Sequence, residues 1–209
     1  MESTKYATAA IAIVIGLALG GFGGYWAGAM QNDNNDNKET TKVEETKTET
    51  KEGVLVGGAL MVRDKDIVDN AAGASNVTTL VSLVKLAELV DTLKSTGPFT
   101  VFGPTNDAFG KLDAATVESL QKPENKAVLA GILTYHVVPG TYTSAALKAM
   151  AQKGETLTSV QGQILKPLID GDKVWIEDAM GGKSMVETAD VISSNGVTHV
   201  IDTVLMPKN

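Results

Sequence analysis

The sequence contains no cysteine. This absence excludes disulfide bonds, thiol nucleophiles, iron–sulfur clusters and zinc–thiolate sites. It also excludes a lipid-modified cysteine as a membrane anchor. Proteins on either side of a membrane can lack cysteine, so the absence does not indicate the compartment.

Positive charge is also scarce. The chain has 18 lysines and arginines against 25 acidic residues, a net charge of −7, and Arg63 is the only arginine. Nucleic-acid-binding domains cluster basic residues on one face, and arginine is the side chain best suited to binding phosphate. No nucleic acid partner is therefore expected.

Histidine occurs only twice, as His136 and His199. Two isolated histidines without cysteines do not make a zinc site, and no serine lies in a G-x-S-x-G elbow that would support nucleophilic catalysis. We therefore expect no catalytic residue, no metal site and no cofactor, and we predict that the protein is not an enzyme. Both histidines are interpreted as structural groups, with His136 bonded to nearby backbone or to Thr105.

One long segment, Tyr6–Gln31, carries no charge. About 20 apolar residues suffice to cross a bilayer as a helix. We therefore predict a short flank over residues 1–6 and either a transmembrane anchor or a signal segment over residues 7–30, with cleavage near Ala29 in the second case. In the first case the rest of the chain is anchored outside the cytoplasm, at the cell surface or in the periplasm. In the second case it is secreted.

Four glycines of this segment recur at intervals of four residues and would share one face of a helix. Such a face lets two membrane helices approach closely, so it predicts self-association through Gly16, Gly20, Gly24 and Gly28. Glycine is also common in membrane helices and signal segments without any such role.

Residues 31–52 are almost entirely Asn, Asp, Thr, Glu and Lys. Such a segment cannot bury enough apolar surface to offset the entropy cost of ordering. We predict a disordered acidic, threonine-rich linker that holds the following domain away from the membrane.

Residues 53–209 are enough for one domain with a hydrophobic core. Apolar spacing predicts helices near 64–72, over 79–93 with Thr78 as cap, over 106–109 with Thr105 as cap, and over 114–120, 124–133 and 144–152, the last ending at Gly154. Strands are predicted over 99–102, 135–138, 164–169, 173–177, 184–187, 191–192 and 197–206, with a hairpin turn at Asp170-Gly171. Helices dominate the first half and strands the second, which predicts an α+β fold.

Three motifs in this domain resemble those of fasciclin-like domains. They are GPFTVFGPTNDAF at Gly97–Phe109, LTYHVVP at Leu133–Pro139 and SNGVTHVIDTVLMP at Ser194–Pro207. They occur in the family's order and spacing, and the match runs from about Asp66 to Pro207. The resemblance implies a wedge of β-strands with helices packed alongside, and a role outside cells in adhesion without a catalytic centre.

The resemblance also implies which residues matter. Some animal members bind integrins through the Tyr-His region, which makes Tyr135 and His136 candidate binding residues here. Other members use an Asp-Ile pair, and the chain departs from that pattern at Thr188–Val191. The motif residues expected to be structural are Phe102, Pro104, Thr105, Asn106, Phe109, Asn195, Gly196 and His199.

These observations predict a non-catalytic, extracytoplasmic module for adhesion or surface attachment, displayed on a tether. Its partner would be a surface polymer or an extracellular protein. The alternative is a module that binds a small apolar or lipid ligand in a groove between the sheet and the helices.

Overall fold

The computed structural model describes residues 52–208, which belong to a compact unit, Thr48–Asn209. The predicted flank (1–6), the membrane or signal segment (7–30) with its four glycines, and all of the predicted linker except Glu52 lie outside the described residues. Within residues 52–208, no helix combines the length and the apolar character needed to cross a membrane.

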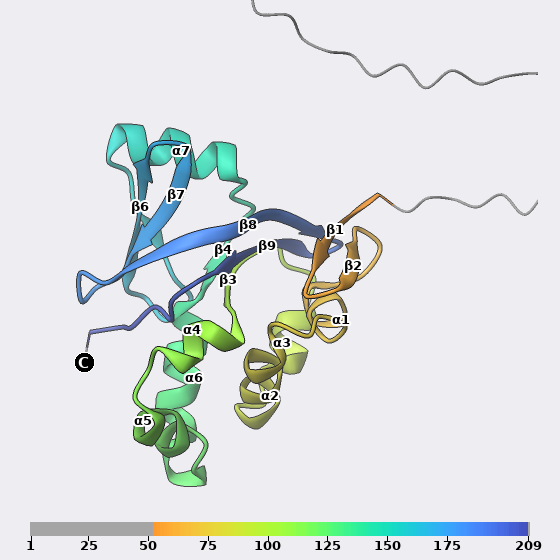
Figure 1. Cartoon of the computed structure of the whole chain (residues 1–209), viewed down its shortest axis with the longest axis vertical. Coiled ribbons are helices and arrows are strands. Elements are labelled where there is room, and N and C mark those ends of the chain that lie inside the picture. Colours follow the sequence, from red (N-terminus) through yellow and green to blue (C-terminus); the bar gives the residue numbers. More distant parts are fainter. Residues whose placement is uncertain (1–51, 209) are drawn as a thin grey trace, which may run out of the picture. The chain divides into compact units, whose positions relative to one another are not determined.

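The domain alternates between helices and strands, with helices concentrated in its first half (Figure 1). The helical elements are α1 Ile67–Ala71, α2 Thr78–Leu86, α3 Val90–Lys94, α4 Asn106–Gly110, α5 Ala114–Leu120, the 3-10 turn η1 Pro123–Asn125, α6 Lys126–Tyr135 and α7 Ser144–Lys153. The strands are β1 Gly53–Val56, β2 Ala59–Val62, β3 Phe99–Pro104, β4 Val137–Pro139, β5 Leu157–Thr158, β6 Ile164–Asp170, β7 Lys173–Glu177, β8 Lys183–Ser193 and β9 Gly196–Ile201.

Seven strands form one sheet in the order β4-β3-β9-β8-β7-β6-β5, and β1 and β2 form a separate hairpin. All neighbours in the large sheet are antiparallel except β3 and β9, which are parallel. The sheet curls until the segment after β5 meets β4, where the Val160 N–H donates to the Val137 carbonyl over 2.7 Å. The result is an α+β fold in which a nearly closed sheet forms a wedge.

The hydrophobic core has three parts. The largest lies between β3 and the helices α1 to α6, and includes Leu83, Leu129 and Val101. A second fills the inside of the curled sheet and is covered by α7, and a third lies beneath the β1–β2 hairpin against β8 and β9. In Figure 1, α7 lies beside β6 and β7, while the other helices gather below β3.

Several local predictions are confirmed. Thr105 caps α4, because its side-chain oxygen accepts a hydrogen bond from the Ala108 N–H over 3.1 Å. Gly154 ends α7 in the left-handed conformation, with φ of 70°. Asp170 and Gly171 join β6 and β7 as a hairpin.

The single helix predicted over 79–93 is wrong, because α2 and α3 are separate. Glu88 adopts a left-handed φ of 58°, and the Leu89 N–H donates to the Val84 carbonyl while the Glu88 N–H donates to the Lys85 carbonyl. This is a Schellman ending, which usually has glycine where Glu88 stands. Leu89, the next residue, is partly buried and packs against the main core.

The strand predicted over 135–138 is also wrong in its first half. Tyr135 ends helix α6 and His136 caps it, so that β4 begins only at Val137. The sequence of this motif is β-branched and aromatic, which favours a strand locally. The segment is helical through Tyr135 because the helix buries Leu129, Ile132 and Leu133 in the main core.

The remaining differences concern strands. The β1–β2 hairpin was not predicted, although Gly57 and Gly58 make its turn with φ of 53° and 79°. The short β5 was also missed. The two predicted segments 184–187 and 191–192 are one bulged strand, β8, and the last strand ends at Ile201, before Met206.

Candidate functional site

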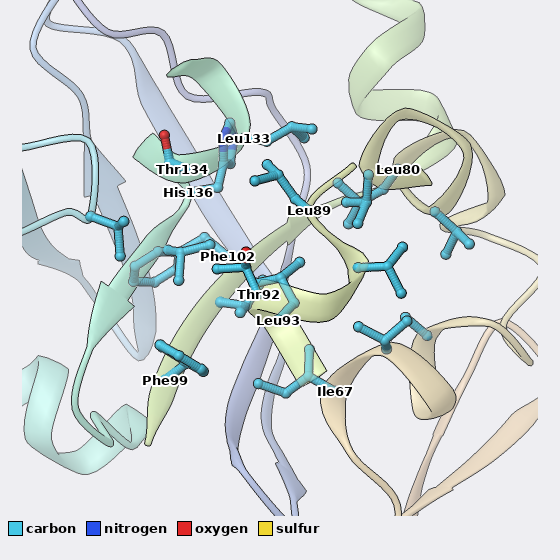
Figure 2. Close-up of a pocket in the computed structure, with 18 of the residues that line it drawn as sticks. Ile67, Leu80, Leu89, Thr92, Leu93, Phe99, Phe102, Leu133, Thr134 and His136 are labelled. Carbon is cyan, nitrogen blue, oxygen red and sulfur yellow. The ribbon is translucent and has the colours of Figure 1, made fainter. Parts of the chain in front are cut away.

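An apolar cavity of about 110 Å³ lies between the α1–α3 layer and the segment joining α6 to β4. Figure 2 shows side chains from α1, α2, α3, β3 and α6 converging on it, among them Ile67, Leu80, Leu93, Phe99 and Leu133. Two of the sequence motifs therefore meet here, since β3 carries one and the α6–β4 segment carries the other. We refer to this space as the apolar cavity.

Asn195 attaches the helical wall of the cavity to the sheet. Its side chain is buried, and its amide oxygen accepts from the Ile67 N–H over 3.0 Å. Its amide nitrogen donates to the carbonyls of Leu93, over 2.7 Å, and Ser95, over 3.0 Å. One side chain in the β8–β9 turn thus provides hydrogen-bond partners for a backbone N–H at the start of α1 and for two carbonyls at the end of α3.

Asn106 has the matching role for α2. The amide oxygen of Asn106 accepts from the Thr79 N–H over 2.9 Å, and the amide nitrogen donates to the Ser75 carbonyl over 2.9 Å. The residue at the N-cap position of α2, Val77, offers no side-chain cap. The prediction that Thr78 caps this helix is therefore wrong, and Asn106, the first residue of α4, caps it instead.

His136 lies on the cavity wall and is completely enclosed. Its Nδ1 is 2.8 Å from the Ile132 carbonyl, and its Nε2 accepts from the Leu205 N–H over 3.0 Å. An acceptor role for Nε2 requires the neutral ring with its proton on Nδ1. Burial lowers the pKa of His136 to about 4, so the ring stays neutral at physiological pH. The predicted backbone bond is confirmed, and Thr105 is not the partner.

Tyr135 points to the other side, into the interior of the curled sheet. Its hydroxyl donates to the Ile164 carbonyl over 2.9 Å and accepts from the Ala179 N–H over 2.8 Å. Burial raises the pKa of this phenol. The hydroxyl therefore connects the start of β6 to the turn between β7 and β8.

A second hollow, of about 1300 Å³, is open to solvent and is lined by α5, α6, the β7–β8 turn and the C-terminal segment. We refer to it as the outer groove. Two of its lining side chains are apolar and largely exposed, Met180 at 64% and Val128 at 54%. Asp178 fixes the turn that carries Met180, because its carboxylate accepts from the N–H groups of Met180 and Gly182.

His199 and Phe102 form a buried pair at the parallel junction of β3 and β9. Their rings stack at 26°, with centroids 5.7 Å apart. His199 Nδ1 accepts from the Asp190 N–H over 3.3 Å, and Nε2 is 2.8 Å from the Tyr142 carbonyl. Burial lowers the pKa of His199, so both histidines are neutral structural groups, as predicted.

Asp190 occupies the place of the family's Asp-Ile pair. It lies in the bulged part of β8 with a φ of 58°, and its carboxylate accepts from the backbone N–H of Ser144 over 2.7 Å and from the Ser144 hydroxyl. A carboxylate at the start of a helix is favoured by the helix dipole. In this chain the side chain of Asp190 holds α7 against the sheet.

The other motif residues are buried at element junctions. Pro104 ends β3 opposite Ile201, and Phe109 belongs to the main core. Gly196 allows β9 to approach β3, since a Cβ there would lie 2.0 Å from the Phe99 carbonyl oxygen.

The two residues predicted to bind a partner are therefore interior groups. Tyr135 and His136 have exposed fractions of 0% and 2%, so their rings could touch a partner only if the surrounding elements opened. Their binding role stays a prediction. Sequence patterns did not indicate the exposed Met180 and Val128, because neither lies in a motif.

Within residues 52–208, no group of three or more histidine or acidic side chains is arranged to hold a metal ion. The charged side chains instead form peripheral ion pairs, such as Lys111 with Asp202 over 3.1 Å. The chemistry available at the two hollows is apolar contact and hydrogen bonding, with charged side chains at Lys85 in the first and at Asp178 and Lys208 in the second.

A nearly closed wedge with an asparagine-tethered helical layer and a buried Tyr-His pair defines a class of β-wedge modules. The model of the fasciclin domain matches residues 75–207, and the chain belongs to this family. It is similar to Protein sll1483 of Synechocystis, with 48% identity over 76% of this chain and 82% of that protein. It is also similar to the cell surface glycolipoprotein MPB83 of Mycobacterium bovis, with 35% identity over 66% of this chain and 60% of that one.

Among solved structures, the fold is similar to a FAS1 domain pair from the insect cell adhesion molecule Fasciclin I. The TM-score is 0.64 at 21% identity, covering 70% of this chain and 52% of that chain. Fasciclin domains are generally extracellular modules related to adhesion, and members of the family are not known as enzymes.

Proposed function

We propose that this protein is a non-catalytic attachment module, held outside the cytoplasm by its N-terminal segment and in contact with a surface polymer or an extracellular protein. The observation that carries the proposal is the outer groove. The exposed apolar side chains of Met180, in the β7–β8 turn, and Val128, in α6, both line it. Contiguous exposed apolar surface with a polar rim is typical of interaction sites.

The buried Tyr-His pair supports this surface from beneath. The Tyr135 hydroxyl fixes Ala179, next to Met180, and also fixes Ile164, whose side chain is 56% exposed. His136 fixes Leu205 in the C-terminal segment, which lines the groove at Met206. The contribution of Tyr135 and His136 to binding is therefore indirect, through the position of groove residues.

The test is attachment by cells that display the full chain, measured as retention under flow on surfaces coated with extracellular polymer or with cell-surface protein. Met180→Asp places a charge in the groove and is expected to reduce retention several-fold. Leu55→Asp is the matched control, because Leu55 is 68% exposed on β1, outside the groove. Equal retention by both variants and the unaltered chain would contradict the groove as the contact surface.

A second candidate function is the binding of a small apolar or lipid ligand. The apolar cavity favours it, because the cavity is lined almost entirely by aliphatic and aromatic side chains. The two functions use different hollows, so they can be tested separately.

A further inference from the structure

We propose that the apolar cavity binds a carboxylate with a short hydrocarbon body, the hydrocarbon inside and the carboxylate at the rim beside Lys85; this inference rests on the second candidate function. The cavity volume, the chemistry of its lining and the charge at its rim each limit the ligand.

The lining excludes water and polar ligands. His136 is the most polar buried group on the wall, and both of its ring nitrogens already have backbone partners. The Thr134 hydroxyl donates to the backbone of its own helix, to the Ala130 carbonyl over 2.7 Å. A water molecule needs two to four polar partners in a buried site, and apolar cavities of similar size stay dry and accept hydrocarbon. An apolar group is therefore the occupant that the lining favours.

The volume limits the length of that group. An apolar cavity of about 150 Å³ accepts benzene, with its six carbons, so a cavity of about 110 Å³ accepts a hydrocarbon group of about four carbons. A six-carbon carboxylate would place about four carbons inside and leave the carboxylate and its neighbouring carbon at the rim.

The rim indicates the polar end of the ligand. Three lining residues are exposed, namely Lys85, Thr92 and Val160. Within residues 52–208, no hydrogen bond or ion pair engages the Lys85 ammonium group. Lys85 is also the only charged residue among those that line the cavity in the described part of the chain. A ligand anion therefore has a cation to meet at the rim.

The experiment is a calorimetric titration of the compact unit Thr48–Asn209, which contains all three core clusters, repeated on the full chain in lipid nanodiscs with empty nanodiscs as the blank. The ligands are butanoate, pentanoate, hexanoate, octanoate and hexanol. We expect affinity to rise about fourfold for each methylene added from butanoate to hexanoate, as burial of one CH₂ group predicts, and then to level off. Hexanol should bind several-fold more weakly than hexanoate.

Two variants and their controls locate the ligand. Lys85→Ala should remove the preference for hexanoate over hexanol, whereas Lys122→Ala, at another exposed lysine, should leave it unchanged. Ala71→Leu adds three carbons on the cavity wall and should abolish binding without lowering the melting temperature. Ala145→Leu is the matched control on the exposed face of α7.

The outcomes separate the two levels of the proposal. Equal binding of hexanoate and hexanol, unchanged by Lys85→Ala, would overturn the carboxylate preference but keep the cavity as an apolar ligand site. Binding that survives in a folded Ala71→Leu variant would overturn the location. If neither hexanoate nor hexanol binds, the second candidate function itself fails.

Discussion

The helical layer α1–α3 and the strand half β5–β8 are held in place by different kinds of interaction. Backbone ladders fix the strands, for example over the five paired positions between β6 and β7. The helical layer instead depends on three asparagine side chains, Asn195, Asn106 and Asn70, together with apolar packing around a cavity. We therefore expect the helical layer to open more readily than the strand half.

Asn195→Ala is expected to have the largest effect on the difference between the helical layer and the strand half. The substitution leaves the Ile67 N–H and the carbonyls of Leu93 and Ser95 without their partner. At about 1–3 kcal/mol for each unsatisfied buried group, and with some recovery by water, we expect a loss of about 4 kcal/mol in the free energy of unfolding. Urea denaturation measures it, and hydrogen exchange should show lost protection in α1 and α3 before β6 and β7.

Asn125→Ala is the control for that prediction, because within residues 52–208 the partly exposed side chain of Asn125 bonds only to Ser119. This variant should lose much less of the free energy of unfolding than Asn195→Ala. Uniform loss of protection across helices and strands in Asn195→Ala would contradict the separate behaviour of the two regions.

Acid should weaken the domain through His136, which connects α6 to the C-terminal segment. The folded-state pKa is about 4 against an ordinary value of 6.5. Between those values the unfolded chain binds one more proton than the folded chain, so the free energy of unfolding falls as pH falls from 6.5 to 4. At about 1.4 kcal/mol per pH unit the loss is about 3 kcal/mol, and burial of His199 adds a loss in the same direction.

Urea denaturation across this pH range tests the expectation, with His136→Gln as the comparison. Glutamine does not titrate, so the variant should be less stable at pH 7 but show a shallower loss toward pH 4. The same slope in both proteins would mean that other groups cause the acid sensitivity.

A smaller effect is expected from Tyr135→Phe in the strand half. The variant keeps the ring in its core position and removes the hydroxyl that bonds Ile164 and Ala179. We expect a loss of about 1–2 kcal/mol in thermal or urea unfolding, along with weaker attachment if the groove needs this support. Tyr142→Phe is the control, since no hydrogen bond engages the Tyr142 hydroxyl within the described residues.

Local signals in the sequence predicted local structure well. The threonine cap at Thr105, the glycine end at Gly154 and the Asp170-Gly171 turn each depend on neighbouring residues, and each is present. The end of α2 before Glu88 and the end of α6 at His136 were missed. Packing against residues distant in the sequence, and not local propensity, determines where these helices end. The α+β class followed from the order of these local elements.

The positions of the two hollows and the contacts that form their walls could not be predicted from such local signals. Asn195 contacts Leu93 and Ile67, which are 102 and 128 residues away in the chain. No spacing rule connects such residues, so the motif marked Asn195 as important without showing its role. The resemblance also marked Tyr135 and His136 as candidate binding residues; the structure shows that both rings are buried, and their binding role stays a prediction.

The link between the Val160 N–H and the Val137 carbonyl brings together the two ends of the large sheet. An open strand edge presents unpaired backbone groups that can recruit a strand from another molecule. With its edges brought together, the large sheet offers little for such recruitment. We therefore expect copies of this domain to lie close together on one surface and keep their individual folds, as the proposed attachment function would require.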